Sequence, residues 1–157
     1  MTDPQSGFQT MQISDLAEVL AIEQAAYPVP WSKGNFIDSL AAGYPALVLR
    51  DQQGLMLGYL LALKGPDEMH LLNLALLPEQ QGRGLARLML DELCRLSRQH
   101  CCDSLWLEVR QSNLRARRFY QRYGFEEVGM RPAYYPVLQG QREDAVLMNL
   151  TLAGDPA

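Results

Sequence analysis

Three short segments of the chain contain residues whose types and spacing could support chemistry. They are "EQQGRGLARLML" (79–90), with two glycines before a helical pattern, "SLWLEVR" (104–110), with a carboxylate inside an apolar strand, and "LRARRFYQRYGF" (114–125), with a tyrosine on the apolar side of a helical pattern. A glycine turn before a helix binds anions, a carboxylate accepts protons and a phenol donates them. Each segment also has a purely structural interpretation.

The glycine segment is the one with the clearest ligand chemistry. Gly82 and Gly84 can adopt positive φ and bring backbone amides close to an anion at a helix start, where Arg83 and Arg87 could add charge. No Gly-Lys-Ser/Thr follows, so this is not a Walker loop, and Arg87 stands at the third glycine position of a dinucleotide fingerprint. Taken alone, the pattern is equally compatible with a plain turn before a helix.

The carboxylate and the phenol are ambiguous when each is considered alone. Strand alternation places Trp106, Glu108 and Arg110 on one face, where Glu108 could simply pair with an arginine. Its place near the carboxyl end of an inner strand favours a functional group. Tyr120 follows on the inner face of the next helical pattern, where it could equally be a core residue beside Phe119.

The periodicity of the whole chain predicts a mixed α/β sheet with helices on both faces. We expect a strand at 11–14 and a helix beginning after a Ser14 N-cap, then a short helix capped by Ser32. Strands follow at 46–50, 55–63 and 70–77, a helix starts at 85, a strand spans 104–109, a helix is capped by Ser112 and two strands close the chain. The order is β-α-α-β-β-β-α-β-α-β-β.

Length and composition are those of one soluble domain, which we place at 1–152, with a short tail at 153–157. No apolar run reaches the roughly 20 residues that a membrane span needs, and no basic-then-apolar leader begins the chain, so we expect a cytoplasmic protein. The net charge of −4 argues against direct nucleic-acid binding. The spacing of the three cysteines and two histidines predicts no metal site.

With these elements in place, the chain resembles the GCN5-related N-acetyltransferase superfamily over essentially its whole length. Residues 81–86, "QGRGLA", match that superfamily's pyrophosphate loop, Q/R-x-x-G-x-G/A. "PWS" (30–32), "LWLEVRQSN" (105–113), "YQRYGF" (120–125), "YYP" (134–136) and "REDA" (142–145) narrow the resemblance to the branch that acetylates the N-terminal alanine of ribosomal proteins. The segment from "YYP" to "REDA" is one residue longer than that branch usually has.

The resemblance implies acetyl-CoA as the donor and assigns residues by position. Glu108 falls on the general base and Tyr120 on the general acid. Acetyl-CoA would be bound by backbone groups of Leu74, Ala75 and Leu76, by the loop residues Gly82, Arg83, Gly84, Leu85, Ala86 and Arg87, and by Asn113. Trp31, Tyr134 and Tyr135 would line the acceptor groove. No metal is required.

The implied acceptor is the N-terminal α-amine of a ribosomal protein, and we expect a monomer. An α-amine has a pKa of about 8, whereas a lysine near 10.4 needs about 3 kcal/mol more to lose its proton. Two other functions stay open: acetylation of a small-molecule amine, and a noncatalytic acyl-CoA-binding module. Arg115, Arg118 and Arg122 lie on the helix face opposite Tyr120 and are expected to be solvated.

Overall fold

The structure is a computed structural model that describes residues 7–135 and 142–152. The tail expected at 153–157 and most of the lengthened segment after "YY" lie outside the described residues. The elements are β1 (Phe8–Thr10), α1 (Leu16–Ala26), α2 (Lys33–Ala41), β2 (Ala46–Arg50), β3 (Met56–Lys64), β4 (Glu68–Leu76), α3 (Leu85–Gln99), β5 (Ser104–Arg110), α4 (Leu114–Tyr123), β6 (Glu126–Tyr135) and β7 (Glu143–Thr151), with short 3-10 turns at Ile13–Asp15 and Pro78–Gln80.

The strands form one mixed sheet in the order β1-β2-β3-β4-β5-β7-β6. β4 and β5 run parallel, whereas β1, β2 and β3 pair antiparallel along one part of the sheet and β5, β7 and β6 along the other. The predicted order of strands and helices and the mixed α/β class are confirmed. The chain divides into an N-terminal unit, Met1–Leu63 with Leu72–Asp91, and a C-terminal unit, Lys64–Leu71 with Glu92–Ala157.

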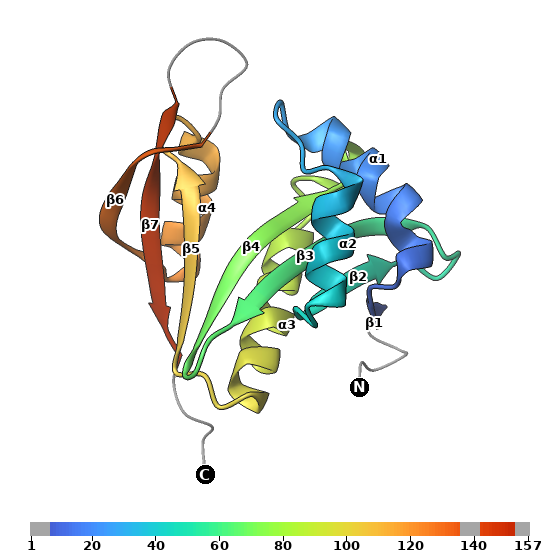
Figure 1. Ribbon diagram of the computed structural model, residues 1–157, viewed down its shortest axis with the longest axis horizontal. Coiled ribbons are helices and arrows are strands. Elements are labelled where there is room, and N and C mark those ends of the chain that lie inside the picture. Colours follow the sequence, from blue (N-terminus) through green and yellow to red (C-terminus); the bar gives the residue numbers. More distant parts are fainter. Residues whose placement is uncertain (1–6, 136–141, 153–157) are drawn as a thin grey trace. The chain divides into compact units, whose positions relative to one another are not determined.

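In the N-terminal unit, helices cover both faces of the strands (Figure 1). Leu16, Val19 and Phe36 from α1 and α2 pack on Val48 and Tyr59 of β2 and β3, where they form a buried apolar cluster. Gly58, next to Tyr59 and so on the opposite face of β3, lies close to Met89 of α3. Apolar burial on both faces explains why β3 reads as a continuous apolar run.

The N-terminus corrects two details of the predicted fold. The first strand is Phe8–Thr10 instead of 11–14, and Asp15 instead of Ser14 stands at the N-cap of α1. Asp15 accepts a hydrogen bond from the Gln12 amide at 2.7 Å, which closes a 3-10 turn over the residues assigned to the strand. Ser32 caps α2 as predicted, because its Oγ accepts from the amide of Asn35.

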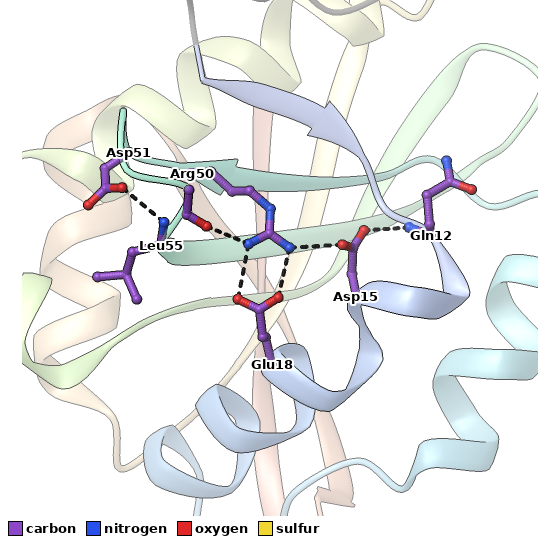
Figure 2. Close-up of polar contacts among 7 residues, drawn as sticks. Gln12, Asp15, Glu18, Arg50, Asp51 and Leu55 are labelled. Atoms are coloured by element: carbon purple, nitrogen blue, oxygen red, sulfur yellow. Dashed lines mark hydrogen bonds and ion pairs between the residues drawn. The ribbon is translucent and has the colours of Figure 1, made fainter.

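A cluster of charges joins the start of α1 to the end of β2 (Figure 2). Arg50 donates to both carboxylate oxygens of Glu18, at 2.9 and 3.0 Å, and to Asp15 at 2.9 Å. It also donates to the carbonyl of Gly54 at 2.8 Å. The pKa of Glu18 is lowered, primarily by its hydrogen bond from Arg50. This cluster connects sequence positions more than thirty residues apart and so stabilises the edge of the N-terminal unit.

In the C-terminal unit, β5, β7 and β6 pair side by side. The partly buried residues of α4 include Ala116, Phe119, Tyr120 and Tyr123, so Tyr120 and Phe119 lie on the inner face as predicted. The predicted cap of α4 is wrong: Asn113, and not Ser112, is the N-cap, and its Oδ1 accepts from the Ala116 amide, while the Ser112 amide donates to Glu143 at 2.7 Å. None of the helices in the described part of the chain has the length and apolarity to cross a membrane.

Candidate active site

The glycine loop of the N-terminal unit has the geometry of an anion site. Gly82 and Gly84 have φ of +81° and +79°, and a Cβ placed on either would meet no heavy atom within 4 Å. Glycine is therefore needed there for backbone conformation and not for space. Leu88 makes the first helical hydrogen bond, to Gly84, so the amides of the first turn, Leu85 to Arg87, have no carbonyl partner within the helix.

Charge completes this loop. Arg83 and Arg87 are exposed, one between the two glycines and one at the first turn of α3. Positive side chains beside unpaired helix amides suit a pyrophosphate. The conformation and the charge of the loop are therefore compatible with the phosphate end of a CoA-type ligand.

The segment of β4 before the loop is held firmly. The carbonyl of Leu74 accepts a hydrogen bond from the Tyr27 hydroxyl, and the Leu77 amide donates to the Leu57 carbonyl at 2.9 Å. Ala75 and Leu76 are buried, and a Cβ on Gly58 would lie 2.6 Å from the Ala75 carbonyl oxygen. The β4 backbone that the resemblance assigned to acetyl-CoA is thus held by β3 and by Tyr27, the residue that follows α1.

A buried carboxylate that the sequence reasoning missed lies in the same unit. Glu23 is only 1% exposed and accepts hydrogen bonds from the Tyr59 hydroxyl, from Asn73 Nδ2 at 2.8 Å and from the Trp31 amide at 2.8 Å. It therefore ties α1, β3, β4 and the segment containing Trp31 together. Trp31 packs on Phe36 with ring centroids 5.3 Å apart. This residue, which we expected to line the acceptor groove, therefore also packs against the apolar core of the N-terminal unit.

In the C-terminal unit, strand alternation is confirmed: Leu105, Leu107 and Val109 are buried, whereas Trp106, Glu108 and Arg110 face the other side. The Glu108 side chain is only 7% exposed. Its Oε1 lies 3.4 Å from His70 Nε2 and 3.4 Å from Arg131 Nη1. The contact with an arginine was one of the two predicted possibilities, but the histidine was not anticipated.

The pKa of Glu108 is lowered by these neighbours. His70 has the largest effect, burial opposes it, and the hydrogen bond from Tyr134 and the charge of Arg131 add to the lowering. Glu108 is therefore a carboxylate throughout the neutral range and can accept hydrogen bonds but not donate them.

Tyr120 is half-buried on α4, between the rings of Phe119 and Phe125, with centroids at 5.3 and 5.5 Å. Burial raises the pKa of its phenol to about 12, so it keeps its proton at neutral pH. The pKa of Tyr135 is raised first by burial and then by the charge of Glu108, with Tyr120 among its further influences.

The "REDA" segment explains how the two tyrosines of β6 are positioned. Ala133 has φ of +51°, an uncommon conformation for a residue with a side chain. Its amide donates to Asp144 Oδ1 at 2.8 Å, and Arg142 donates to the carbonyls of Ala133 and Tyr134 at 2.8 and 2.7 Å. β7 therefore fixes a bend in β6 that directs Tyr134 to Glu108.

The remaining predicted residues have simpler environments. Asn113 caps α4 with its side-chain oxygen, a structural role that leaves the predicted cofactor contact untested. Arg115, Arg118 and Arg122 are all exposed, as expected of a solvated face. Within the described residues no group of three or more histidine, cysteine or acidic side chains could hold a metal ion.

The order of elements, the mixed sheet and the glycine loop before α3 define the class of protein. The chain belongs to the acetyltransferase (GNAT) family, whose sequence model matches residues 16–125. Members of this family use acetyl-CoA.

Particular relatives are more informative than the family. The chain is 38% identical to the "[Ribosomal protein bS18]-alanine N-acetyltransferase" of Haemophilus ducreyi, over 92% of this chain and 99% of the relative. It is 35% identical to the protein of the same name from Escherichia coli K12, over 92% and 96%. The crystal structure of the ribosomal-protein-S18-alanine N-acetyltransferase from Escherichia coli superposes with a TM-score of 0.84, 34% identity and coverage of 96% and 97%.

Of the two functional residues that the sequence reasoning missed, Glu23 had a recognisable signal in the sequence and His70 did not. Glu23 interrupts the buried face of α1 formed by Leu16, Val19 and Ile22, and Asn73 is a polar residue within an apolar central strand. Two polar residues at apolar positions indicate a buried pair. His70 gave no such signal, because its proximity to Glu108 depends on the β4–β5 register, in which His70 pairs with Trp106.

Proposed function

We propose that this chain transfers the acetyl group of acetyl-CoA to the N-terminal alanine of ribosomal protein bS18. The observation that supports this most is the near-complete coverage and 35–38% identity shared with relatives named for that reaction. The C-terminal unit supplies the side chains such a reaction needs, an ionised Glu108 and a protonated Tyr120. The chain's net charge of −4 suits a basic partner.

Acetyl-CoA would be held by the N-terminal unit. The amides of Leu85, Ala86 and Arg87 and the side chains of Arg83 and Arg87 bind the pyrophosphate, and the backbone of Leu74, Ala75 and Leu76 binds the pantetheine arm. The conformation of Gly82 and Gly84 and the exposure of both arginines support this assignment. When bound, acetyl-CoA supplies the activated acyl group.

The roles of the chain's own residues follow from their protonation. Glu108 accepts a hydrogen bond from the acceptor amine and draws its proton away, which leaves the nitrogen lone pair free to attack the thioester carbonyl. Tyr120 donates its phenolic proton to the departing sulfur, and takes up the second proton that the nitrogen releases. The N–C bond forms as the C–S bond breaks, and no covalent enzyme intermediate is required.

The test is an acceptor comparison. The purified chain is incubated with acetyl-CoA and release of free thiol is followed with a peptide of the first residues of bS18, with the same peptide already Nα-acetylated, and with spermidine. We expect turnover with the free peptide and mass spectrometry to place one acetyl group on its N-terminal nitrogen. Turnover with spermidine and not with the peptide would instead support a small-amine acetyltransferase. Binding of acetyl-CoA without turnover on either would support a noncatalytic module.

A further inference from the structure

The second partner of Glu108, His70, has a buried nitrogen without a hydrogen bond. His70 Nε2 has less than 1 Å² of exposed surface and forms no hydrogen bond within the described residues. It nevertheless lies 3.4 Å from Glu108 Oε1, and the His70 side chain as a whole is 31% exposed. A buried polar atom left without a partner costs free energy. Its position beside a carboxylate therefore needs a reason.

A carboxylate oxygen and an imidazole nitrogen that face one another satisfy both atoms when one proton lies between them. The carboxylate is an acceptor only, and a neutral imidazole that carries its proton on Nδ1 presents Nε2 as a second acceptor. Bringing a proton to Nε2 turns this contact into a charge-assisted hydrogen bond. In that tautomer the pair can take up one proton, at the residue expected to receive the proton of the substrate amine.

Glu108 alone is poorly matched to that task. An α-ammonium group has a pKa of about 8 and an ordinary glutamate about 4.3, and the pKa of Glu108 is lowered further by its neighbours. A proton resting on Glu108 would be disfavoured by more than about a thousandfold relative to the amine. The imidazole nitrogen beside Glu108 Oε1 is a second proton acceptor that can take this proton from the carboxylate.

We propose that His70 is the resting place of the proton that Glu108 draws from the acceptor amine. The inference rests on the proposed function, and His70 acts through Glu108 without touching the acceptor. One proton passes from the ammonium nitrogen by way of Glu108 to His70 Nε2 and later to solvent. The second leaves the nitrogen as the amide forms and replaces the one that Tyr120 gives to the CoA sulfur. Acetyl-CoA and the ammonium become the N-acetyl product, free CoA and one released proton.

Other charged groups near the pair do not take this role. Arg131 and Tyr134 approach Glu108 from β6, and both lower its pKa. From β7 the residue paired with Glu108 is Leu147, which does not titrate. Lys64, at the end of β3, donates to the carbonyl of Gly65.

The remaining titratable groups discussed for the C-terminal unit do not take the proton from Glu108, because they are paired with another residue or keep a proton of their own. Arg110 lies on the same face of β5 as Glu108 and pairs with Glu143 of β7 at 3.4 Å. Glu143 also accepts a hydrogen bond from the Ser112 amide. Tyr120 and Tyr135 have raised pKa values, so both are proton donors at neutral pH. His70 is consequently the base available to Glu108 within the described part of the unit.

The experiment compares His70→Gln with His100→Gln. His100, exposed just after α3, is the chain's other histidine and serves as the matched control. kcat for acetylation of the bS18 peptide is measured by thiol release from about pH 6 to pH 9.5. His70→Asn is measured in parallel in case Gln does not fit, and acetyl-CoA affinity at about pH 7.5 reports that each variant is folded.

Without His70, loss of the amine proton depends on solvent, so activity should follow ionisation of the amine itself. We expect the His70 variants to lose about tenfold or more of kcat near pH 6.5 and less than about threefold near pH 9, which moves the acid side of the profile upward. His100→Gln should follow the wild type. A loss of equal size at every pH, or an unchanged profile, overturns the inference. Failure of the wild type to acetylate the peptide would instead overturn the proposed function.

Discussion

At the scale of single residues, protonation state separates the roles of the two proposed catalytic groups. Burial raises the pKa of Tyr120 to about 12, while the neighbours of Glu108 lower the pKa of that carboxyl. One group therefore holds a proton and the other lacks one across the whole neutral range. Pairs of titratable groups driven apart in this way are typical of acid–base sites.

Tyr120→Phe tests the acid directly. Removing the hydroxyl leaves the ring contacts with Phe119 and Phe125 in place but takes away the proton for the leaving sulfur. We expect kcat to fall by about 10- to 100-fold with acetyl-CoA affinity unchanged. Tyr123→Phe, one turn further along α4, is the matched control and should retain wild-type kcat. Equal kcat in wild type and Tyr120→Phe would return Tyr120 to a packing role.

The raised pKa of Tyr120 also predicts how the kcat of the wild type depends on pH at the alkaline end. Because the pKa of Tyr120 is raised to about 12, it should not lose its proton during an assay that ends near pH 9.5. A decline of kcat within that range would have to come from another group.

At the scale of elements, the sequence predicted the order of helices and strands and the positions of the chemical residues on them. The glycine turn, the alternation of β5 and the inner face of α4 are local patterns, and all three were recognised. Contacts that depend on strand register could not be predicted from the sequence. His70 reaches Glu108 only because Glu68↔Ser104 begins the parallel ladder, and no local pattern encodes that pairing.

The bend in β6 is an element-level feature with a testable energetic origin. Asp144 accepts from the Ala133 amide and thereby offsets the positive φ at Ala133, a conformation that costs on the order of 1–3 kcal/mol. Asp144→Ala should release the bend and move Tyr134 from Glu108. We expect the KM for the bS18 peptide to rise about fivefold or more, with acetyl-CoA affinity unchanged.

A second substitution separates strain from a direct role of Asp144. Glycine adopts positive φ without cost, so Ala133→Gly should restore part of the peptide KM when combined with Asp144→Ala. If the double variant is no better than Asp144→Ala alone, the aspartate acts by some means other than holding the bend.

The buried Glu23 network joins four segments of the N-terminal unit. Glu23→Ala leaves the Tyr59 hydroxyl and the Asn73 amide buried without their shared acceptor. We expect a loss of about 2–5 kcal/mol in the free energy of unfolding, measured by urea titration. Gln24→Ala, at the exposed neighbouring position, should change it by less than about 0.5 kcal/mol. Equal midpoints for the two variants would show that the network adds no stability.

Gly58 tests the path of β4 where acetyl-CoA is expected to bind. A Cβ at this position would lie 2.6 Å from the Ala75 carbonyl oxygen and 2.7 Å from Leu76 Cδ2, so the strand must shift. We expect Gly58→Ala to weaken acetyl-CoA binding by about tenfold or more, measured by calorimetry. Gly34→Ala is the control: it lies in α2, where a Cβ would meet only Ser32 Oγ, at an ordinary contact distance of 3.7 Å. It should gain up to about 1 kcal/mol of stability without changing acetyl-CoA affinity.

If acetyl-CoA affinity survives Gly58→Ala, the backbone of Ala75 and Leu76 is not a determinant of binding. The loop at Gly82 and Gly84 would then have to supply most of the affinity through its amides and arginines.

At the scale of the whole molecule, the two compact units contain different parts of the proposed chemistry. The anion loop and the β4 backbone belong to the N-terminal unit, and Glu108, Tyr120 and His70 belong to the C-terminal unit. Substitutions at the anion loop or at the β4 backbone should therefore change acetyl-CoA affinity, and substitutions at Glu108, Tyr120 or His70 should change turnover.

Ionised carboxylates in both units make the stability of the whole chain sensitive to acid. The pKa values of Glu18, Glu108 and Glu143 are all lowered, each by a partner that favours the charged form: Arg50, His70 and Ser112 respectively. A folded-state pKa below the unfolded value of about 4.3 contributes stability that is present above that value and is lost as pH falls through the folded pKa. We therefore expect Tm to be nearly constant from pH 7 to about 5 and to fall steeply below about pH 4.5.

Glu18→Gln isolates one of these contributions, because it removes the charge that Arg50 contacts with two hydrogen bonds (Figure 2). The variant should melt below the wild type at pH 7, and the difference should shrink toward zero as acid protonates Glu18 in the wild type. Scanning calorimetry at pH 7, 5, 4 and 3 measures this convergence. A Tm difference that stays constant down to pH 3 would mean that the stability Glu18 provides does not come from its charge, and that the Arg50 cluster is not among the sources of acid sensitivity.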